Sequence, residues 1–324
     1  MDTAVDPDLL RRFVEAAERL AISKRVGLAV SGGPDSMAML LLADAAGFDC
    51  HVATVNHGLR AEAVNECRLV EDLCGKLDVP CTIININLAK GNVQQEARRA
   101  RYSTLAQWAT RERLELILTA HHADDQAETL LMRLNRGSGL AGLAGVRERR
   151  LIEGTDIELA RPLLGFRRSE LQAVIDGAGV AVADDPSNRD RVFDRVRLRQ
   201  GLERSDWIDV DGLARSASLI EESWSMVEGL AAEDVTLHTK RHGEAFAYDP
   251  FAASGVARVP VWIEVVRMIA GDLGVTLVRG DAAKIVAALQ DARKVNVGGV
   301  SAEVIEEDGT NLWLLKRETP RRNA

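Results

Sequence analysis

The stretch AVSGGPDSMAMLLLADAAG, residues 29–47, decides the fold. It predicts a strand that runs into a glycine turn and then into a helix that begins near Asp35, an arrangement that commonly binds phosphate. A P-loop of the GxxxxGK[ST] kind carries a lysine that reaches the β and γ phosphates of a nucleotide. This turn has no lysine, so a different use of the nucleotide is predicted.

The turn SGGPDS offers several groups to an anion. Its glycines let the backbone approach a phosphate closely, and the helix behind them presents unpaired amides at its positive end. Asp35 repels phosphate unless a Mg²⁺ ion lies between them, which predicts a site that releases pyrophosphate with metal. The residues predicted to form this phosphate-binding turn are Ser31, Gly32, Gly33, Pro34, Asp35 and Ser36. The simpler alternative is a helix capped by Asp35 or Ser36.

Four β-rich runs alternate with helical patterns between residues 25 and about 121. The runs are RVGLAVSGG, DCHVATVNH, PCTIININ and LELILTAHH. Such alternation predicts an α/β fold with a parallel sheet, right-handed helical crossovers and a ligand at the carboxyl ends of the strands. A last strand is expected around ELARPLL. Residues 137–150, glycine-rich and then basic, predict either a mobile loop beside the site or a flexible linker.

The alternation stops after about residue 205. We therefore predict a catalytic domain over residues 1–205 and a smaller, mostly helical or α+β, C-terminal domain over residues 206–324. Apolar residues at helical spacing predict an amphipathic helix over residues 211–230. Asp308-Gly309 predicts a hairpin turn.

The composition sets broad limits on the function. The chain has 324 residues, 46% of them hydrophobic and 28% charged, as in soluble globular proteins. No apolar run approaches the roughly 20 residues that span a bilayer, and the acidic N-terminus is unlike a signal peptide, so we expect a cytoplasmic protein without membrane contact. The net charge of −8 argues against a protein coated in nucleic acid.

A local basic surface is still open at RVFDRVRLR, where arginines 191, 195, 197 and 199 lie close together. The alternative is a solvated helix face paired with Asp190 and Asp194. Four cysteines have spacings that fit neither a zinc ribbon nor a redox dithiol, and buried thiols are predicted. They are Cys50, Cys67, Cys74 and Cys81.

A second group of polar residues follows the fourth strand, in TAHHADDQAETLLMRLNRGSG, residues 119–139. It contains His121, His122, Asp124, Asp125 and Glu128. Histidines and carboxylates at the end of a strand suit metal binding or proton transfer. The alternative is an acidic first helical turn with Asp124 as its cap, which leaves the histidines unexplained. A zinc site is less favoured, because no further ligand pattern accompanies it.

Five motifs carry a resemblance to a known family. SGGPDS resembles the SGGxDS loop of the PP-loop ATP pyrophosphatases, which cleave ATP between the α and β phosphates. With NHGLR at 56–60, EARRARY at 96–102, AHHADDQAET and DDPSNRDRVFDRVRLR, the chain closely resembles the tRNA(Ile)-lysidine synthetases over residues 25 to about 200. The resemblance implies an ATP-dependent ligase that joins lysine to the wobble cytidine of the CAU anticodon of tRNA(Ile). Lysidine pairs with A instead of G, so the tRNA changes its identity.

The resemblance also implies roles for individual residues. Asp35, Arg101, His121 and Asp125 match the catalytic residues of the family, and Asp35 and Asp125 are the implied Mg²⁺ ligands. The cytidine 2-carbonyl oxygen attacks the α phosphate, and the lysine amine then displaces AMP. A carboxylate must accept a proton from that amine; Asp124, Asp125 and Glu128 are the candidates, and the sequence does not choose among them.

Arg195 is the implied partner of the substrate, together with Asp124 and Glu128. Two departures from the family stand out: Asn56 replaces an aspartate, and Val196 follows Arg195 where the family often has asparagine. The C-terminal part resembles a single tRNA-binding extension, and a homodimer is left open. Rival functions are tRNA thiolation, which needs reactive cysteine pairs, an amidating PP-loop enzyme, which needs an ammonia source, and an RNA-binding module with a degenerate pocket.

Overall fold

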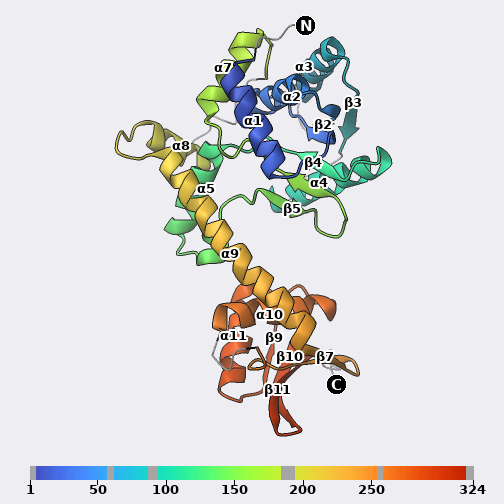
Figure 1. The fold of residues 1–324 in the computed structure, drawn as a ribbon, viewed down its shortest axis with the longest axis vertical. Coiled ribbons are helices and arrows are strands. Elements are labelled where there is room, and N and C mark those ends of the chain that lie inside the picture. Colours follow the sequence, from blue (N-terminus) through green and yellow to red (C-terminus); the bar gives the residue numbers. More distant parts are fainter. Residues whose placement is uncertain (1–4, 57–61, 87–93, 184–193, 254–257, 319–324) are drawn as a thin grey trace. The chain divides into compact units, whose positions relative to one another are not determined.

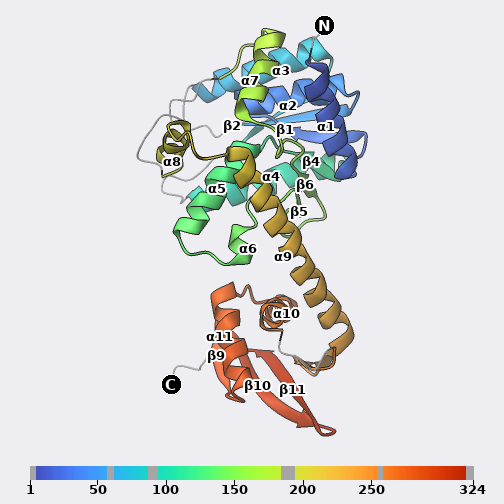
Figure 2. The ribbon, with the colours of Figure 1, turned by 60° about the vertical axis from the view of Figure 1, so that its left-hand side comes forward.

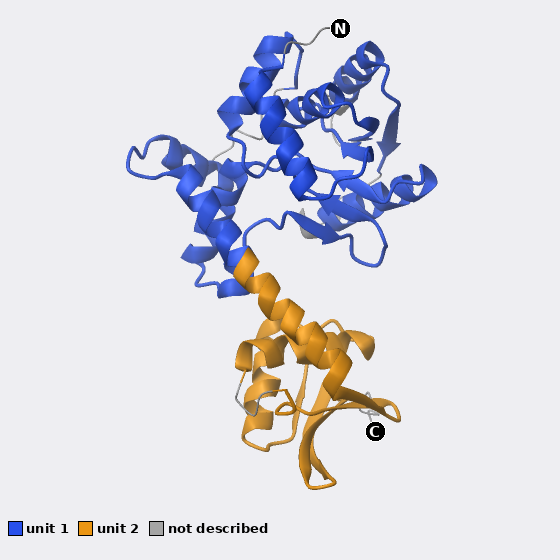
Figure 3. Ribbon diagram, in the orientation of Figure 1, with its two compact units in different colours: residues 1–221 blue, residues 222–324 orange. Residues whose placement is uncertain are grey.

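A computed structural model describes residues 5–56, 62–86, 94–183, 194–253 and 258–318. The chain forms two compact units, Met1–Glu221 and Glu222–Ala324, which are coloured separately in Figure 3. The division falls inside a long helix, α9 (Val210–His238), which includes the helix predicted over 211–230. The domain boundary predicted between residues 205 and 206 stays a prediction.

The first unit contains a six-stranded sheet in the order β3-β2-β1-β4-β6-β5. Figure 1 labels β2, β3, β4 and β5 of this sheet. Five strands are mutually parallel, as predicted, and the edge strand β5 is antiparallel to β6. Their bounds are β1 (Arg25–Ala29), β2 (Asp49–Asn56), β3 (Cys81–Asn85), β4 (Leu116–Leu118), β5 (Arg149–Leu151) and β6 (Glu158–Ala160). The order reverses direction between β1 and β4, where ligands of such sheets bind.

Helices cover both faces of this sheet. They are α1 (Pro7–Arg19), α2 (Pro34–Ala45), α3 (Glu62–Leu77), α4 (Gln94–Arg111), α5 (Ala123–Asn135), α6 (Leu140–Leu143), α7 (Arg168–Ala178) and α8 (Asp194–Glu203). One hydrophobic cluster joins α1, α2, α3 and α7 to one face, and a second joins α4 to the opposite face. Figure 2 shows α2 and α4 on opposite sides of the strands.

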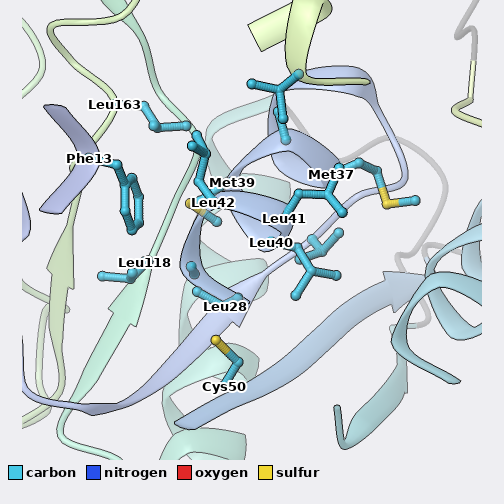
Figure 4. Close-up of a cluster of buried hydrophobic side chains, with 14 of the residues drawn as sticks. Phe13, Leu28, Met37, Met39, Leu40, Leu41, Leu42, Cys50, Leu118 and Leu163 are labelled. Atoms are coloured by element: carbon cyan, nitrogen blue, oxygen red, sulfur yellow. The ribbon is translucent and has the colours of Figure 1, made fainter. Parts of the chain in front are cut away.

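Helix α2 is the centre of the core, because its sequence MAMLLLA is apolar on every side. All residues from Ser36 to Ala43 are buried, and a helix that is apolar all round must be covered all round. Figure 4 shows its methionines and leucines between Phe13 of α1, Leu163 and the strand residues Leu28 and Leu118. This packing fixes the N-terminus of α2 at the end of β1.

On the opposite face, α4 comes close to the backbone of β1. A Cβ atom at Gly27 of β1 would lie 2.9 Å from the ring of Trp108, so only glycine permits this approach. The contact positions α4, and with it Arg101 and Tyr102, against the strand that leads into the glycine turn.

Residues 137–150 contain regular structure, whereas the sequence predicted a mobile loop or a flexible linker there. This segment includes α6 and the start of β5. Gln126 of α5 donates to the Val146 carbonyl at 2.8 Å and accepts from the Val146 amide at 2.6 Å. Arg133 donates to the Gly145 carbonyl at 2.9 Å. Hydrogen bonds from α5 thus hold this glycine-rich segment in place.

The second unit is α+β. An antiparallel sheet in the order β7-β8-β11-β10-β9 packs against two helices. The elements are β7 (Thr239–His242), β8 (Ala245–Tyr248), α10 (Val259–Asp272), α11 (Arg279–Gln290), β9 (Val295–Val297), β10 (Val300–Glu307) and β11 (Thr310–Arg317). Trp262 and Trp313 meet edge to face at 5.1 Å between ring centroids. The hairpin predicted at Asp308-Gly309 joins β10 to β11.

All four cysteines are free thiols. Cys50, Cys67 and Cys74 are buried, as predicted, whereas Cys81 is only half-buried. Within the described ranges, no helix combines the length and the apolar character needed to cross a membrane.

Candidate functional site

A cavity of about 410 Å³ lies at the carboxyl ends of β1 and β4. Because these strands are neighbours, the glycine turn after β1 and the His-Asp segment after β4 meet there, although they are far apart in sequence. The predicted site residues that line it are Ser31, Gly33, Asp35, Ser36, Arg101, His121, Asp125 and Arg195. Gly32, Pro34, Asp124 and Glu128 do not line it.

The glycine turn leaves the N-terminus of α2 without a side-chain cap, so the simpler alternative, a helix capped by Asp35 or Ser36, is wrong. The Ser36 hydroxyl instead accepts from the Ser31 amide at 3.1 Å and donates to the Gly33 carbonyl at 3.0 Å. Gly32 has φ +82°, and a Cβ there would lie 3.0 Å from the carbonyl oxygen of Glu66. Sterics therefore require glycine at position 32, and the helix amides remain open to an anion.

His122 connects the two segments. Its side chain is 1% exposed, and its Nε2 lies 3.4 Å from Asp35 Oδ2 and 3.7 Å from Asp125 Oδ2. Asp35 and Asp125 thus share one neighbour at the edge of the cavity. On the other side of the ring, Nδ1 lies 3.5 Å from Asp124 Oδ2. Burial lowers the pKa of His122, but its carboxylate neighbours outweigh burial and raise the pKa to about 9, so the imidazole is protonated at neutral pH.

Asp124 and Glu128 already have strong partners. Asp124 accepts from the Arg168 amide at 2.8 Å and from the Arg167 guanidinium at 3.3 Å, which ties α5 to the start of α7. Glu128 is buried and accepts from Nε of Arg195 and of Arg199, each at 2.7 Å, which ties α5 to α8. Burial opposes ionisation of Asp124, but the hydrogen bonds hold its pKa below the usual range. Both carboxylates hold helices together.

Asp125 is the acidic residue of this segment that faces the cavity. Its Oδ2 accepts from the His122 amide at 3.2 Å, which caps α5, and its Oδ1 lies 3.5 Å from Arg195. The sequence analysis offered Asp124 as the cap of this helix, and the structure corrects this to a capping box of His122 and Asp125. Burial alone would raise the pKa of Asp125, but the positive charges of His122 and Arg195 outweigh burial and lower the pKa below its usual value. Asp125 is therefore ionised beside the cavity.

His121 is a neutral imidazole. Burial, followed by the charge of Arg161, lowers its pKa to about 3. Arg161 Nε donates to His121 Nδ1 at 3.3 Å, so the ring proton lies on Nε2. A neutral imidazole that carries a fixed N–H donates a hydrogen bond to an anion across the whole physiological pH range.

Comparisons with known proteins agree with this geometry. Residues 5–205 match the profile of the PP-loop domain, an ATP-binding family. The chain is 38% identical to the tRNA(Ile)-lysidine synthase of Zymomonas mobilis, over 97% of this chain and 96% of that protein. It is 42% identical to the tRNA(Ile)-lysidine synthase of Novosphingobium aromaticivorans, over 96% and 94%. The chain belongs to the tRNA(Ile)-lysidine synthase family.

A solved structure supports the PP-loop fold of this lysidine synthase family member. The U34-tRNA thiolase NcsA from Methanococcus maripaludis, described with its [4Fe-4S] cluster, is similar with a TM-score of 0.57 and 16% identity, over 66% of this chain and 78% of that chain. This likeness concerns the fold alone. No cysteine is among the described residues that line the cavity of the present chain.

One carboxylate oxygen of this site suits a metal ion. Asp35 Oδ1 is buried and has no hydrogen-bond partner within the described ranges, and such an oxygen suits a cation. No group of three or more metal-binding side chains occurs in the described part of the chain. Mg²⁺ commonly binds through one or two carboxylates and substrate phosphates, so Asp35 and Asp125 would hold such an ion only together with oxygens of a bound nucleotide.

Sequence reasoning missed several residues of the site. It noticed His122 but gave it no role, and it did not single out Tyr102, Arg161, Arg167 or Arg168. The available signal for Arg161 was its position directly after the strand run ELA, at a strand end where functional residues are expected. The motifs at residues 57–60 and 184–193 lie outside the described residues; Asn56, which starts the former, donates to Asn85 Oδ1 at 3.1 Å.

Proposed function

We propose that this protein ligates lysine to the wobble cytidine of tRNA(Ile) with a CAU anticodon, in the cytoplasm, with ATP and Mg²⁺. One observation carries the proposal: Asp35 and Asp125, 90 positions apart in the sequence, share His122 beside one cavity. The names of relatives that match almost the whole chain support tRNA(Ile) as a substrate and lysidine as the product.

The first step is adenylation of cytidine. Its 2-carbonyl oxygen attacks the α phosphate of ATP, the bond between the α phosphorus and the bridging oxygen breaks, and pyrophosphate leaves. Bound Mg²⁺ supplies charge neutralisation at the phosphate oxygens. The protein supplies the open amides of α2, the Arg101 guanidinium and the Nε2–H of His121, all of which can stabilise the negative charge that develops.

The second step is attack by lysine. Its ε-amine, with a usual pKa of about 10.4, must lose a proton before it attacks C2 of the cytidine and expels AMP. We assign proton acceptance to Asp125, because it lines the cavity and the other two candidates, Asp124 and Glu128, do not. The guanidinium of Arg195 lies 3.5 Å from Asp125, where it keeps the carboxylate ionised and oriented.

Mass spectrometry of the tRNA(Ile) anticodon tests this function, after incubation with ATP and isotopically labelled lysine. Labelled lysidine is expected with the wild-type protein and not with Asp35→Asn or Asp125→Asn. Asp44→Asn, the same change near the opposite end of α2, is the matched control and should retain activity. Unlabelled tRNA after incubation with wild type would overturn the proposal.

ATP/pyrophosphate exchange separates the proposal from its rivals. The proposed enzyme should exchange label only when a cytidine-bearing tRNA is present, and lysine should be unnecessary. An amino-acid-activating ligase would show the opposite requirement.

The C-terminal unit is proposed to contribute to tRNA binding. The proposal rests on its position after the PP-loop domain, since residues 206–324 carry no chemical motif. A protein that ends at residue 221, where the first compact unit ends, should bind tRNA more weakly and ATP equally. Unchanged tRNA affinity would refute this role.

A further inference from the structure

Arginine side chains cluster around Tyr102 at the side of the cavity. The guanidinium carbons of Arg98, Arg101 and Arg150 lie 5.4, 5.3 and 4.9 Å from the centroid of the Tyr102 ring. Arg98 and Arg101 come from α4, and Arg150 comes from the edge strand β5. Tyr102 is 6% exposed, and such a ring orients planar guanidinium groups by stacking.

A fourth arginine completes the group on its buried side. Arg161, 2% exposed, donates to the Arg147 carbonyl and to His121. Positive charges around the Tyr102 hydroxyl, with Arg98 the strongest, overcome the effect of burial and lower the pKa of Tyr102 to about 8. Arg161 therefore links the cluster to the neutral His121 of the cavity.

These four arginines lack acidic partners. No carboxylate of the described residues pairs with any of them, whereas their sequence neighbours are paired: Arg99 with Glu153 at 3.2 Å, and Arg149 with Glu158. Arginine cannot discharge itself by losing a proton. Four unneutralised guanidinium groups repel one another, and a bound anion would relieve that repulsion.

The cluster is continuous with the cavity, because Arg101 and Tyr102 line it together with the glycine turn. An anion that binds there would touch both the cavity and the surface arginines. Planar, forked guanidinium groups match the several oxygens of a phosphate group better than they match a spherical anion.

We propose that Arg98, Arg101, Arg150 and Arg161 form, around Tyr102, a site for a phosphate group of the reactants. The inference rests on the proposed function, which provides two sources of that group: the pyrophosphate that leaves ATP and a phosphodiester of the tRNA. Both present the same oxyanion chemistry, and the arms of the experiment below separate them.

The test measures binding of inorganic pyrophosphate with Mg²⁺, and separately of an RNA anticodon stem-loop, by calorimetry. Arg98→Gln and Arg150→Gln are compared with wild type, and Arg99→Gln, the same change one position along α4, is the matched control. Loss of one charge-assisted contact should weaken binding about tenfold or more, and the control should change it little. Arg150→Lys retains the charge without the fork and should fall between.

Weakened pyrophosphate binding assigns the site to the leaving group, and weakened RNA binding alone, with a smaller salt dependence, assigns it to the tRNA backbone. The site is refuted if folded variants bind both ligands as wild type does, or if Arg99→Gln weakens binding equally, which would mean diffuse charge. Because these measurements need neither lysine nor turnover, an absence of lysidine from wild-type incubations would refute the proposed function and not this site.

Discussion

Replacing His122 by glutamine should destabilise the protein at neutral pH and hardly at high pH. The substitution keeps a polar side chain of similar size and removes the positive charge that lies 3.4 to 3.7 Å from Asp35, Asp124 and Asp125. Three carboxylates would then face one another without a cation between them, which costs free energy in a buried place.

The pKa of His122 sets the magnitude. A folded value of about 9 against the usual 6.5 corresponds to about 3 kcal/mol at roughly 1.4 kcal/mol per pH unit. The folded state holds the proton more tightly than the unfolded state, so this stabilisation is complete below pH 6.5 and is lost as the pH rises through 9. The destabilisation caused by His122→Gln should therefore shrink by about 3 kcal/mol between about pH 6 and pH 10.

Urea unfolding of both proteins, followed at several pH values, measures this difference. Tyr102 and Glu221, whose pKa values are also shifted to about 8 and about 7, titrate in both proteins, so their effects largely cancel in the comparison. A destabilisation that stays constant with pH would mean that His122 is neutral in the folded protein. A destabilisation that grows with pH would mean that the folded state binds the His122 proton more weakly than the unfolded state.

Three further substitutions test other parts of the structure. Gly32→Ala should lower stability by about 1–2 kcal/mol, because φ is +82° and Glu66 is close, and should weaken ATP binding in a fluorescence titration; unchanged binding would contradict the steric argument. Gly75→Ala, at an exposed position inside α3 with open space around it, should instead raise stability in thermal unfolding by about 0.5–1 kcal/mol. Glu128→Gln should cost about 2 kcal/mol, less than a fully buried pair because its arginine partners are 40% and 21% exposed, and hydrogen exchange should show earlier opening of α8. Unaltered exchange there would argue that other contacts hold that helix.

Local signals made most of the first unit predictable. The parallel strands, the crossover helices and the glycine turn follow from runs of apolar residues and from residues with special backbone freedom, which act over a few positions. Strand β5 was missed because RERR carries no apolar alternation. It forms because β6 offers a free edge, and its residues Arg149 to Leu151 pair with Glu158 to Ala160.

The site was predictable as a set of residues and not as an arrangement. Six of the residues that line the cavity, Ser31, Gly33, Asp35, Ser36, His121 and Asp125, could be named because they follow strand ends, where parallel sheets collect functional groups. The sequence assigned the histidine role to His121, but His122 lies between the carboxylates. Adjacent residues at the end of a strand point in opposite directions, and nothing local says which of the two faces the glycine turn.

The sequence by itself determined that a phosphate-binding turn follows a buried strand, since Gly32 and the apolar α2 impose this conformation through their own sterics and hydrophobicity. Only the tertiary structure decided which of the three carboxylates lines the cavity. Asp124 and Glu128 are taken by arginines 43 and 71 positions away, and Asp125 is left beside the cavity. That outcome depends on how α7 and α8 pack on α5, because a charge is neutralised by whatever the fold brings within a few ångströms, however distant it is along the chain.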